Sequence, residues 1–242
     1  MPGRPLLLAN AWDAASARAV EAAGFAAVAT GSAAVAASLG FADHEAAPVD
    51  AMLDAVSRIA GAVSVPVTAD LEAGYGLEAD ELVGRLLATG AVGCNLEDTD
   101  HRNERLAGLD DQAAWIAAIR AAADRSGVPI VVNARTDVFL RGEGSPDEQL
   151  AEAIRRGRRY REAGADGFYP IWVVDEAAIA ALVEAVEGPV NVYARPEAPS
   201  ITRLAELGVA RVSYGPWMHR LVMRELDRAL EAIRSGQGPY LD

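Results

Sequence analysis

The chain has 242 residues, of which 51% are hydrophobic, a formal net charge of −13 and a single cysteine. So negative a charge argues against nucleic acid or an anionic membrane as a partner, because both require a basic surface. The single cysteine excludes a disulfide within the chain and is typical of a reducing compartment, so we expect a cytoplasmic protein.

The N-terminal segment predicts a first strand and not a signal peptide. Its apolar run, residues 6–9, is too short for the hydrophobic core of a signal peptide, and Asn10 and Asp13 follow it closely. No window of the sequence approaches the length of an apolar transmembrane helix, so we expect no membrane partner.

Alanine-rich helices that end at a glycine and lead into a short apolar strand recur along the chain, for example at residues 21–29 and 162–169. Glycine is favoured there because the backbone after a helix often adopts a left-handed conformation. On this pattern, strands are expected near residues 6–11, 26–30, 66–72, 92–98, 129–136, 167–171, 189–194 and 210–215. Helices are expected near residues 13–23, 48–62, 78–89, 110–126, 146–163, 174–186, 199–207 and 217–234.

Strands that each lead into a helix predict an α/β fold with a closed parallel sheet, a (β/α)8 TIM-type barrel that forms one domain over residues 1–242. The alternative is an open, doubly wound sheet. It is disfavoured because no glycine-rich dinucleotide fingerprint follows the first strand. Barrel enzymes carry their active sites on the loops after the strands, so a functional site is expected at the strand ends.

Three of the expected strands end in charged residues that an ordinary strand would not carry. Because side chains alternate between the faces of a strand, certain pairs share a face. These pairs are Asp70 with Glu72, Asn95 with Glu97, and Asn133 with Arg135. In one parallel sheet, three carboxylates and a guanidinium would meet at the same edge, and the carboxylates would repel unless a cation lay among them. The pattern predicts a metal-dependent enzyme in which Arg135 binds an anionic substrate.

Two connections after strands stand out by composition. Residues 30–44 are rich in small side chains, which let backbone N–H groups approach a carboxylate or phosphoryl group closely; a flexible surface loop is the alternative. Residues 99–108 follow Glu97 directly and are strongly polar. They are expected to form either a lid over the site or a solvated loop with no role.

Six motifs together carry a resemblance to a known family. They are Trp12-Asp-Ala-Ala-Ser-Ala17, Gly31-Ser32, Ala37-Ser-Leu-Gly-Phe-Ala-Asp43, Ala69-Asp-Leu-Glu-Ala-Gly-Tyr-Gly76, Leu96-Glu-Asp98 and Ala134-Arg-Thr-Asp137. As a set they resemble the isocitrate lyase/phosphoenolpyruvate mutase superfamily, and the resemblance covers nearly the whole chain, from Asn10 to about Pro216. Each motif alone is a weak signal.

The resemblance implies a Mg²⁺ site with Asp70 as its direct ligand. Asp43, Glu72 and Glu97 would then hold water ligands of the metal, which suits an ion that keeps several waters and takes few carboxylates. The family commonly has aspartate at the position of Glu72, so the longer side chain is expected to shift one of these waters.

The resemblance also implies how the substrate is held. The backbone amides of Gly31, Ser32 and Ala33 and the guanidinium of Arg135 would bind its carboxylate or phosphonate end, a task that suits the fork of arginine. The implied reaction is C–C cleavage of a small 2-oxo or 2-hydroxy acid, by retro-aldol chemistry or decarboxylation, through a metal-stabilised enolate. The alternatives are P–C chemistry, as in phosphoenolpyruvate mutase or phosphonopyruvate hydrolase, and a non-catalytic protein that binds 2-oxo acids.

The chain departs from the family in the segment after Glu97. Isocitrate and methylisocitrate lyases carry a Lys-Lys/Arg-Cys-Gly-His lid there, and the mutase and hydrolase branch carries Lys-x-Asn-Ser, whereas this chain reads Asp100-His-Arg-Asn-Glu-Arg105. With no cysteine in the segment, His101 is the expected proton donor, and an exposed loop histidine is its alternative. Cys94 is expected to be buried and inert.

Three further expectations concern structure. The alternative to a functional role for Arg135 and Asp137 is a salt bridge between them at the rim of the barrel. The basic run at residues 155–159 is expected to be a solvated helix face. Leu221, Leu226, Leu230 and Ile233 in the last helix have the spacing of core residues or of a subunit contact. The resemblance implies a homo-oligomer, a dimer or tetramer, with this last helix in the interface.

Overall fold

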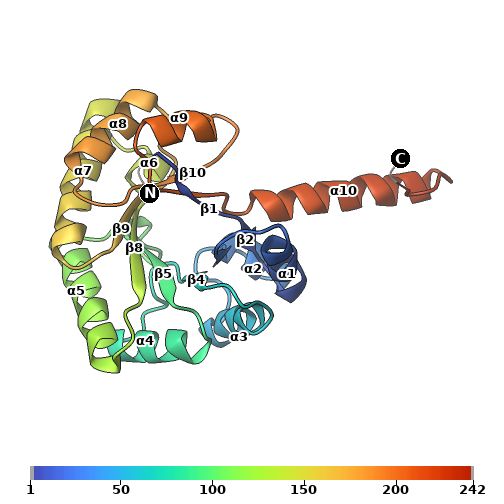
Figure 1. Cartoon of the computed structure of the whole chain (residues 1–242), viewed down its shortest axis with the longest axis horizontal. Coiled ribbons are helices and arrows are strands. Elements are labelled where there is room, and N and C mark those ends of the chain that lie inside the picture. Colours follow the sequence, from blue (N-terminus) through green and yellow to red (C-terminus); the bar gives the residue numbers. More distant parts are fainter. Residues whose placement is uncertain (1–2, 241–242) are drawn as a thin grey trace.

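Strands and helices alternate along the chain in the computed structural model, which describes residues 3–240 (Figure 1). The strands that build the barrel are β1 Leu6–Leu8, β2 Asn10–Ala11, β3 Val28–Thr30, β4 Val67–Asp70, β5 Gly93–Glu97, β8 Val131–Thr136, β9 Gly167–Pro170, β10 Asn191–Tyr193 and β11 Arg211–Ser213. Each lies within a segment that the sequence predicts as a strand, and β1 and β2 together form the first.

All of these strands pair in parallel, in two sheets. One sheet has the order β2-β3-β4-β5-β8-β9 and the other has the order β1-β11-β10. The sheets meet at both of their edges, because only Ala9 separates β1 from β2 and a parallel bridge joins Phe168 of β9 to Val190 before β10. The expected α/β barrel architecture is therefore confirmed.

The helices that follow the strands are also those expected. They are α1 Ala14–Ala22, α3 Val49–Ala60, α4 Ala79–Ala88, α5 Leu109–Ser126, α7 Pro146–Glu162, α8 Glu176–Ala185, α9 Ile201–Glu206 and α10 Trp217–Arg234. In α3, the buried residues Met52, Leu53, Val56 and Ile59 recur at helical spacing and pack into the core that surrounds the barrel. In α7, Ser145 caps the first turn and Pro146 occupies its first position.

Three short elements were not predicted, and all three lie in the connections after strands. They are helix α2 Ser32–Ser38, helix α6 Val138–Arg141, and a hairpin made of the antiparallel strands β6 Thr99–Asp100 and β7 Arg105–Leu106. The hairpin lies within the polar loop expected at residues 99–108, and α2 occupies seven of the fifteen residues of the loop expected at residues 30–44. These connections are therefore ordered structures at the mouth of the barrel.

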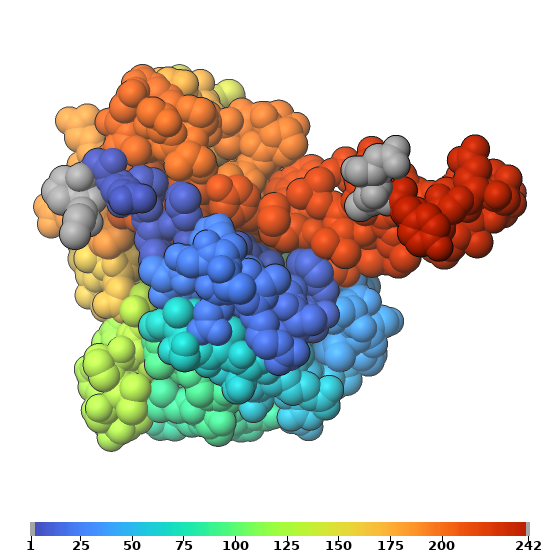
Figure 2. All heavy atoms as spheres, turned by 45° about the vertical axis from the view of Figure 1, so that its right-hand side comes forward, coloured from blue at the N-terminus to red at the C-terminus, as the bar shows by residue number. Residues whose placement is uncertain are grey.

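Helix α10 projects from the body of the molecule and has no buried residue (Figures 1 and 2). Its large apolar side chains are exposed: Leu221, Val222, Met223, Leu226, Leu230 and Ile233. The reading of these residues as the core of their own chain is wrong, because the helix turns away from the barrel. Within residues 3–240, no helix combines the length and apolarity needed to cross a membrane.

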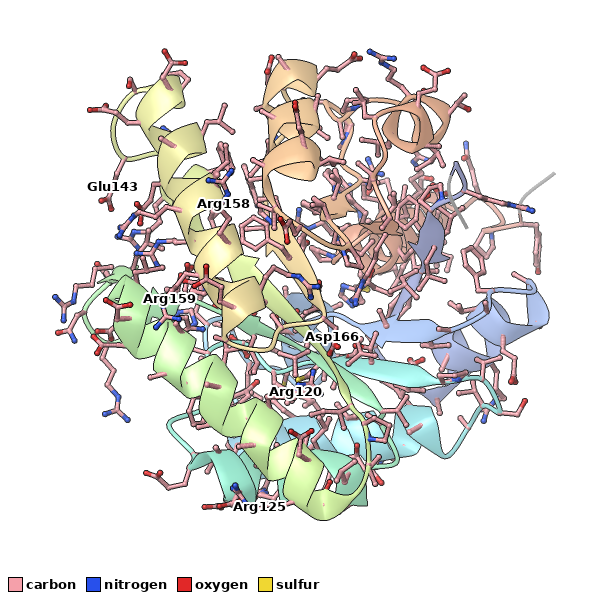
Figure 3. All side chains as sticks on the ribbon, turned by 60° about the vertical axis from the view of Figure 1, so that its left-hand side comes forward. Arg120, Arg125, Glu143, Arg158, Arg159 and Asp166 are labelled. Atoms are coloured by element: carbon pink, nitrogen blue, oxygen red, sulfur yellow. The ribbon has the colours of Figure 1, made fainter. Side chains whose placement is uncertain are left out.

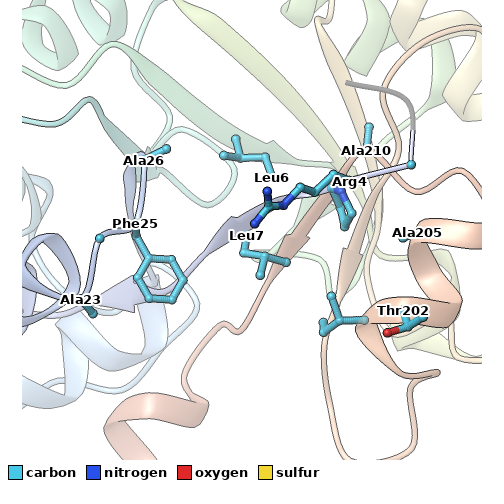
Figure 4. Close-up of a pocket in the computed structure, with 13 residues that line it drawn as sticks. Arg4, Leu6, Leu7, Ala23, Phe25, Ala26, Thr202, Ala205 and Ala210 are labelled. Carbon is cyan, nitrogen blue, oxygen red and sulfur yellow. The ribbon is translucent and has the colours of Figure 1, made fainter.

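A groove of about 850 Å³ opens between α1 and α9, beside β1 (Figure 4). In a (β/α)8 barrel the helix after the last strand packs at this position, against the last and first strands. Because α10 turns away, Leu6, Leu7 and Phe25 line the groove together with Ala205 and Ala210, and Leu6 remains 42% exposed.

Candidate active site

Asp70 ends β4 and lies beside Asn95 of β5 at the carboxyl edge of the sheet. Its Oδ2 accepts a hydrogen bond of 3.0 Å from the backbone N–H of Ser32, the first residue of α2. Its Oδ1 is buried and has no hydrogen-bond donor. Burial raises the pKa of Asp70, and the nearby guanidinium of Arg135 opposes that rise. A buried carboxylate oxygen without a donor is costly unless a cation occupies the place of the donor.

Asp43, in the loop after α2, presents a second oxygen of this kind. Its Oδ1 is also buried without a donor, and its negative charge contributes to the raised pKa values of Asp70 and Glu72. Within residues 3–240, no three side chains of histidine, cysteine, aspartate or glutamate come together as a ready-made metal cage. Two unpaired carboxylate oxygens fit Mg²⁺, which takes few protein ligands and keeps waters.

Glu72 lies in the same region, but both of its oxygens are bound by the protein. Oε2 accepts a hydrogen bond of 2.7 Å from the N–H of Glu45, and Oε1 accepts one of 2.6 Å from the hydroxyl of Tyr75. Tyr75 in turn donates its N–H to Oε1 of Glu45 at 2.6 Å. Burial raises the pKa of Glu72 to about 7. Glu72 therefore fastens the loop after α2 to the loop after β4, and each of its oxygens already accepts one hydrogen bond from the protein.

Glu97 ends β5 between a guanidinium and an imidazole. Its Oε2 lies 2.6 Å from Nη1 of Arg135, and its Oε1 lies 2.7 Å from Nε2 of His101. Burial raises the pKa of Glu97 to about 7 against the lowering effect of these two partners, and Glu97 raises the pKa of His101. The β6–β7 hairpin thus brings His101 to the expected site. With its side chain 12% exposed, His101 is not the exposed loop histidine of the alternative reading.

Arg135 is held on one edge by Asp137. Its Nε donates to Oδ1 of Asp137 at 2.6 Å, and its Nη2 donates to Oδ2 at 3.0 Å. The pair is buried, with the two residues 8% and 2% exposed, so the salt bridge exists but does not lie on the rim. A guanidinium has five N–H groups, and three are directed at Asp137 and Glu97. The other two N–H groups are not engaged by these two carboxylates.

The turn at Gly31, Ser32 and Ala33 lies at the start of α2, next to Asp70. The N–H of Ser32 is committed to Asp70. A Cβ atom on Gly31 would lie 3.6 Å from Nδ2 of Asn10 and from the backbone of Gly215, so the turn is closely surrounded by the ends of β2 and β11. Asn10 fixes this arrangement, because its Nδ2 donates to the carbonyl of Thr30 at 2.8 Å.

A cavity of about 410 Å³ opens between the loop after α2, the loop after β4 and the hairpin, and His44, Glu45, Tyr75, His101 and Arg102 line it. The surrounding segments hold non-glycine residues with a left-handed backbone: His44, Glu45, Glu72, Tyr75 and Glu104. Such conformations cost free energy and cluster at functional sites, where the surrounding contacts enforce them.

Two other expectations about single residues have opposite outcomes. Cys94 is buried as expected, and burial raises its pKa to about 12, which disfavours the reactive thiolate. The basic run at residues 155–159 is only partly a solvated face. Arg158 and Arg159 lie on the outer side of α7 (Figure 3), whereas Arg156 is 5% exposed and donates to Asp98.

The signal for the burial of Arg156 was present in the sequence. The buried residues of α7 are Ala153, Arg156, Gly157 and Tyr160, which is the spacing of one helical face. Because Ala153, Gly157 and Tyr160 share this face, Arg156 lies on the inward face of the helix with them. The neighbouring arginines made the whole run look like a solvated basic face. Asp98, at the end of the Glu-Asp strand, is its buried partner and was not among the predicted site residues.

Comparisons with known proteins place the chain among its relatives. The family model for phosphoenolpyruvate phosphomutase matches residues 1–234. The uncharacterized protein Rv1998c of Mycobacterium tuberculosis is 32% identical over 235 residues, which cover 97% of this chain and 87% of the relative. Oxaloacetate decarboxylase 2 of Pseudomonas putida is 29% identical, over 84% of this chain and 68% of the relative.

Solved structures show the same fold. A candidate phosphonomutase from Burkholderia cenocepacia superposes with a TM-score of 0.90 at 43% identity, and the match covers 95% of both chains. 2,3-Dimethylmalate lyase superposes with a TM-score of 0.84 at 26% identity, over 100% of this chain and 86% of that chain. The chain therefore belongs to the phosphoenolpyruvate phosphomutase family, within the isocitrate lyase/phosphoenolpyruvate mutase superfamily.

Proposed function

We propose that the protein is a Mg²⁺-dependent lyase that cleaves a C–C bond of a small 2-oxo or 2-hydroxy carboxylate. The observation that carries the proposal is the pair of buried, unpaired carboxylate oxygens on Asp43 and Asp70, in the same mouth of the barrel as the guanidinium of Arg135. Relatives of the chain are enzymes that act on small acids, among them oxaloacetate decarboxylase and 2-methylisocitrate lyase.

Asp70 and Asp43 would hold the metal in this proposal. Bound there, Mg²⁺ would supply Lewis-acid stabilisation of the negative charge that develops on an enolate oxygen. Arg135 binds the carboxylate of the substrate through its two remaining N–H groups, while Asp137 and Glu97 keep the plane of the guanidinium fixed. A fixed guanidinium costs little reorganisation when the charge of the substrate moves during the reaction.

His101 is the proposed proton donor. Its Nε2 faces the carboxylate of Glu97 at 2.7 Å; this contact raises the pKa of His101, while burial raises the pKa of Glu97 to about 7. A group that titrates close to the operating pH is the most effective general acid. His44 stacks near His101, with the ring centroids 5.3 Å apart, and both face the 410 Å³ cavity through which a substrate would enter.

The sequence of the hairpin favours C–C cleavage, by decarboxylation or retro-aldol chemistry, over P–C chemistry. Residues 100–105 contain neither a cysteine nor the Lys-x-Asn-Ser motif of the mutase and hydrolase branch, and decarboxylation requires no strong acid above the substrate. P–C chemistry is the second candidate, because the candidate phosphonomutase is 43% identical and phosphonopyruvate hydrolase of Variovorax is 35% identical over 126 residues. A non-catalytic protein that binds 2-oxo acids is the third candidate.

A substrate panel separates these candidates. Oxaloacetate, methylisocitrate, isocitrate and phosphonopyruvate are each incubated with the protein and Mg²⁺, and the release of pyruvate, glyoxylate or phosphate is followed. We expect pyruvate from a C–C substrate, and no activity in Asp70→Ala. Phosphate release from phosphonopyruvate would establish the second candidate, and binding without turnover of any substrate would establish the third. Activity that survives Asp70→Ala would overturn the metal-dependent mechanism.

A second copy of the chain is the partner that we propose for α10. The groove between α1 and α9 lies where the helix after the last strand would pack, and α10 carries an uncovered apolar face. An exchange of α10 between two chains would cover both surfaces at once. By light scattering we expect a dimer or a larger even-numbered oligomer. The double change Leu226→Glu with Leu230→Glu should dissociate it, whereas Arg228→Ala on the same helix should not.

The single buried cysteine supports a reducing compartment such as the cytoplasm.

A further inference from the structure

We propose that Arg156, on α7, is the positioning residue that sets the geometry of Arg135 and of the hairpin that carries His101. The inference deepens the proposed function and rests on Arg135 being the cation that binds substrate. Arg156 lies on the inward face of α7, 5% exposed, and donates its hydrogen bonds to protein groups, so it acts through other residues.

The guanidinium of Arg156 joins separate parts of the fold. Its Nη1 donates to Oδ2 of Asp98 at 2.9 Å, its Nη2 donates to the carbonyl of Ala107 at 3.0 Å, and its Nε donates to Oε1 of Glu152 at 2.7 Å. Asp98 follows β5, Ala107 follows β7, and Glu152 lies one turn earlier on α7. Nη1 also donates to the hydroxyl oxygen of Tyr160 at 2.9 Å. The planar, forked guanidinium meets these acceptors in different directions, a geometry that a lysine ammonium does not reproduce.

Asp98 transmits this geometry to Arg135. Besides Arg156, its Oδ2 accepts from the hydroxyl of Thr136 at 2.6 Å and from the hydroxyl of Tyr160 at 2.8 Å. Its Oδ1 accepts from the backbone N–H of Asp137 at 2.9 Å. The carboxylate of Asp137 then holds Nε and Nη2 of Arg135. Arg156 thus reaches Arg135 through two carboxylates and through the backbone at the end of β8.

The same contacts fasten both ends of the hairpin. At its start, the hydroxyl of Thr99 donates to Oδ2 of Asp137 at 2.6 Å. At its end, the carbonyl of Ala107 accepts from Arg156, and the N–H of Ala107 donates to the carbonyl of Asp98 at 2.8 Å. His101 lies between these two attachments and contacts Glu97. A change at Arg156 should therefore loosen Arg135 and the hairpin together.

The test compares Arg156→Lys with Arg155→Met, the matched control. Arg155 is the preceding residue, binds the same Glu152, and has a side chain that is 59% exposed. The first readout is the solvent exchange of the Nε–H of Arg135 by ¹⁵N NMR, assigned from its loss in Arg135→Lys. We expect exchange to accelerate at least about tenfold in Arg156→Lys and to be unchanged in Arg155→Met. Tyr160→Phe, which removes one donor from Asp98, should show a smaller acceleration and serves if Arg156→Lys does not fold.

The second readout separates positioning from a general structural role. Asp43 and Asp70 are outside these contacts, so the thermal stabilisation by Mg²⁺ alone should be the same in Arg156→Lys as in the unmodified protein. Oxalate, a mimic of the pyruvate enolate, should bind at least about tenfold more weakly in the presence of Mg²⁺. Equal losses of Mg²⁺ stabilisation and oxalate affinity would overturn the positioning role, as would unchanged exchange of the Arg135 proton.

The failure of the proposed function has a different signature. If the unmodified protein binds no oxalate with Mg²⁺, while Arg156→Lys still accelerates exchange at Arg135, the proposed function is rejected and the positioning contact is established. If oxalate binds to the unmodified protein and equally well to Arg156→Lys, the proposed function stands and the inference about Arg156 is wrong.

Discussion

The two sides of the barrel mouth differ in chemistry. On the side of β4, β5 and β8, the strand ends carry Asp70, Glu97 and Arg135, and these ionisable groups are buried and held by one another. On the side of β9 and β10, the buried cluster consists of Tyr169, Ile171 and Tyr193, packed against Leu140 and Trp217. Register places Glu97, Arg135 and Tyr169 side by side, so the boundary between the two sides runs along Arg135.

The charged side chains of the barrel mouth therefore come from β4, β5 and β8, and the bulky apolar side chains come from β9 and β10. Buried ions require partners in fixed positions, so the acidic side tolerates little change without loss of stability. Aromatic and aliphatic side chains pack without such obligations, and replacements of similar volume usually cost little. We therefore expect metal and anion binding to depend on the β4–β8 side, and the apolar side to set which substituent of the substrate is accommodated.

The largest expected effect on the free energy of unfolding comes from removing the cation of the charged side. Arg135→Met leaves Glu97 and Asp137 buried without their cation, which should lower the free energy of unfolding by about 3–5 kcal/mol. Urea denaturation at pH 7 without added metal measures the loss. A matched surface change, Arg125→Met, should cost less than about 1 kcal/mol, because the side chain of Arg125 is 59% exposed. A loss at Arg135 no greater than that of the control would contradict a buried ion network.

A pH titration gives the next largest effect. The pKa of Glu72 is raised from 4.5 to about 7 by burial, so the folded protein binds more protons than the unfolded chain between those values. The free energy of unfolding of the metal-free protein should therefore fall as the pH rises from about 5 to 7, at a rate of up to about 1.4 kcal/mol per pH unit for this group. Burial also raises the pKa of Glu97 to about 7, so Glu72→Gln should reduce this slope without abolishing it in denaturation curves recorded across the range. A slope that is equally steep in the variant would assign the proton to another group.

Substitutions on the apolar side should have the smallest effect. Tyr193→Phe keeps the ring volume and removes one hydroxyl, so it should change the free energy of unfolding by no more than about 1 kcal/mol. Oxalate affinity with Mg²⁺ should change less than about threefold. If calorimetry showed a loss comparable to that of Arg135→Ala, the aromatic side would also be part of the anion site and the contrast between the two sides would not hold.

Much of this arrangement could be predicted from local sequence patterns. Glycine-terminated helices and short apolar strands located the barrel elements, and the alternation of side chains along β4, β5 and β8 brought Asp70, Glu97 and Arg135 to one edge. These patterns act over a few residues, and parallel pairing then fixes which strand ends meet. Cys94 was placed correctly by the same alternation.

What could not be predicted depends on contacts between distant residues. Glu72 is bound by Glu45, 27 residues away, and Asp98 is bound by Arg156, 58 residues away, so neither partner is visible in a local pattern. The hairpin that positions His101 pairs only two residues in each of its strands, too few for a periodic signal. The apolar face of α10 was recognised, but periodicity does not indicate that the helix leaves its own barrel.

The most direct test of the central claim is calorimetry of oxalate binding with and without Mg²⁺. We expect binding that requires Mg²⁺ and is lost in Asp70→Ala and in Arg135→Ala, but not in Arg125→Ala on the surface. Binding that is equally strong without Mg²⁺, or no binding under either condition, would mean that the carboxylates at the barrel mouth are structural and that the proposed lyase function is wrong.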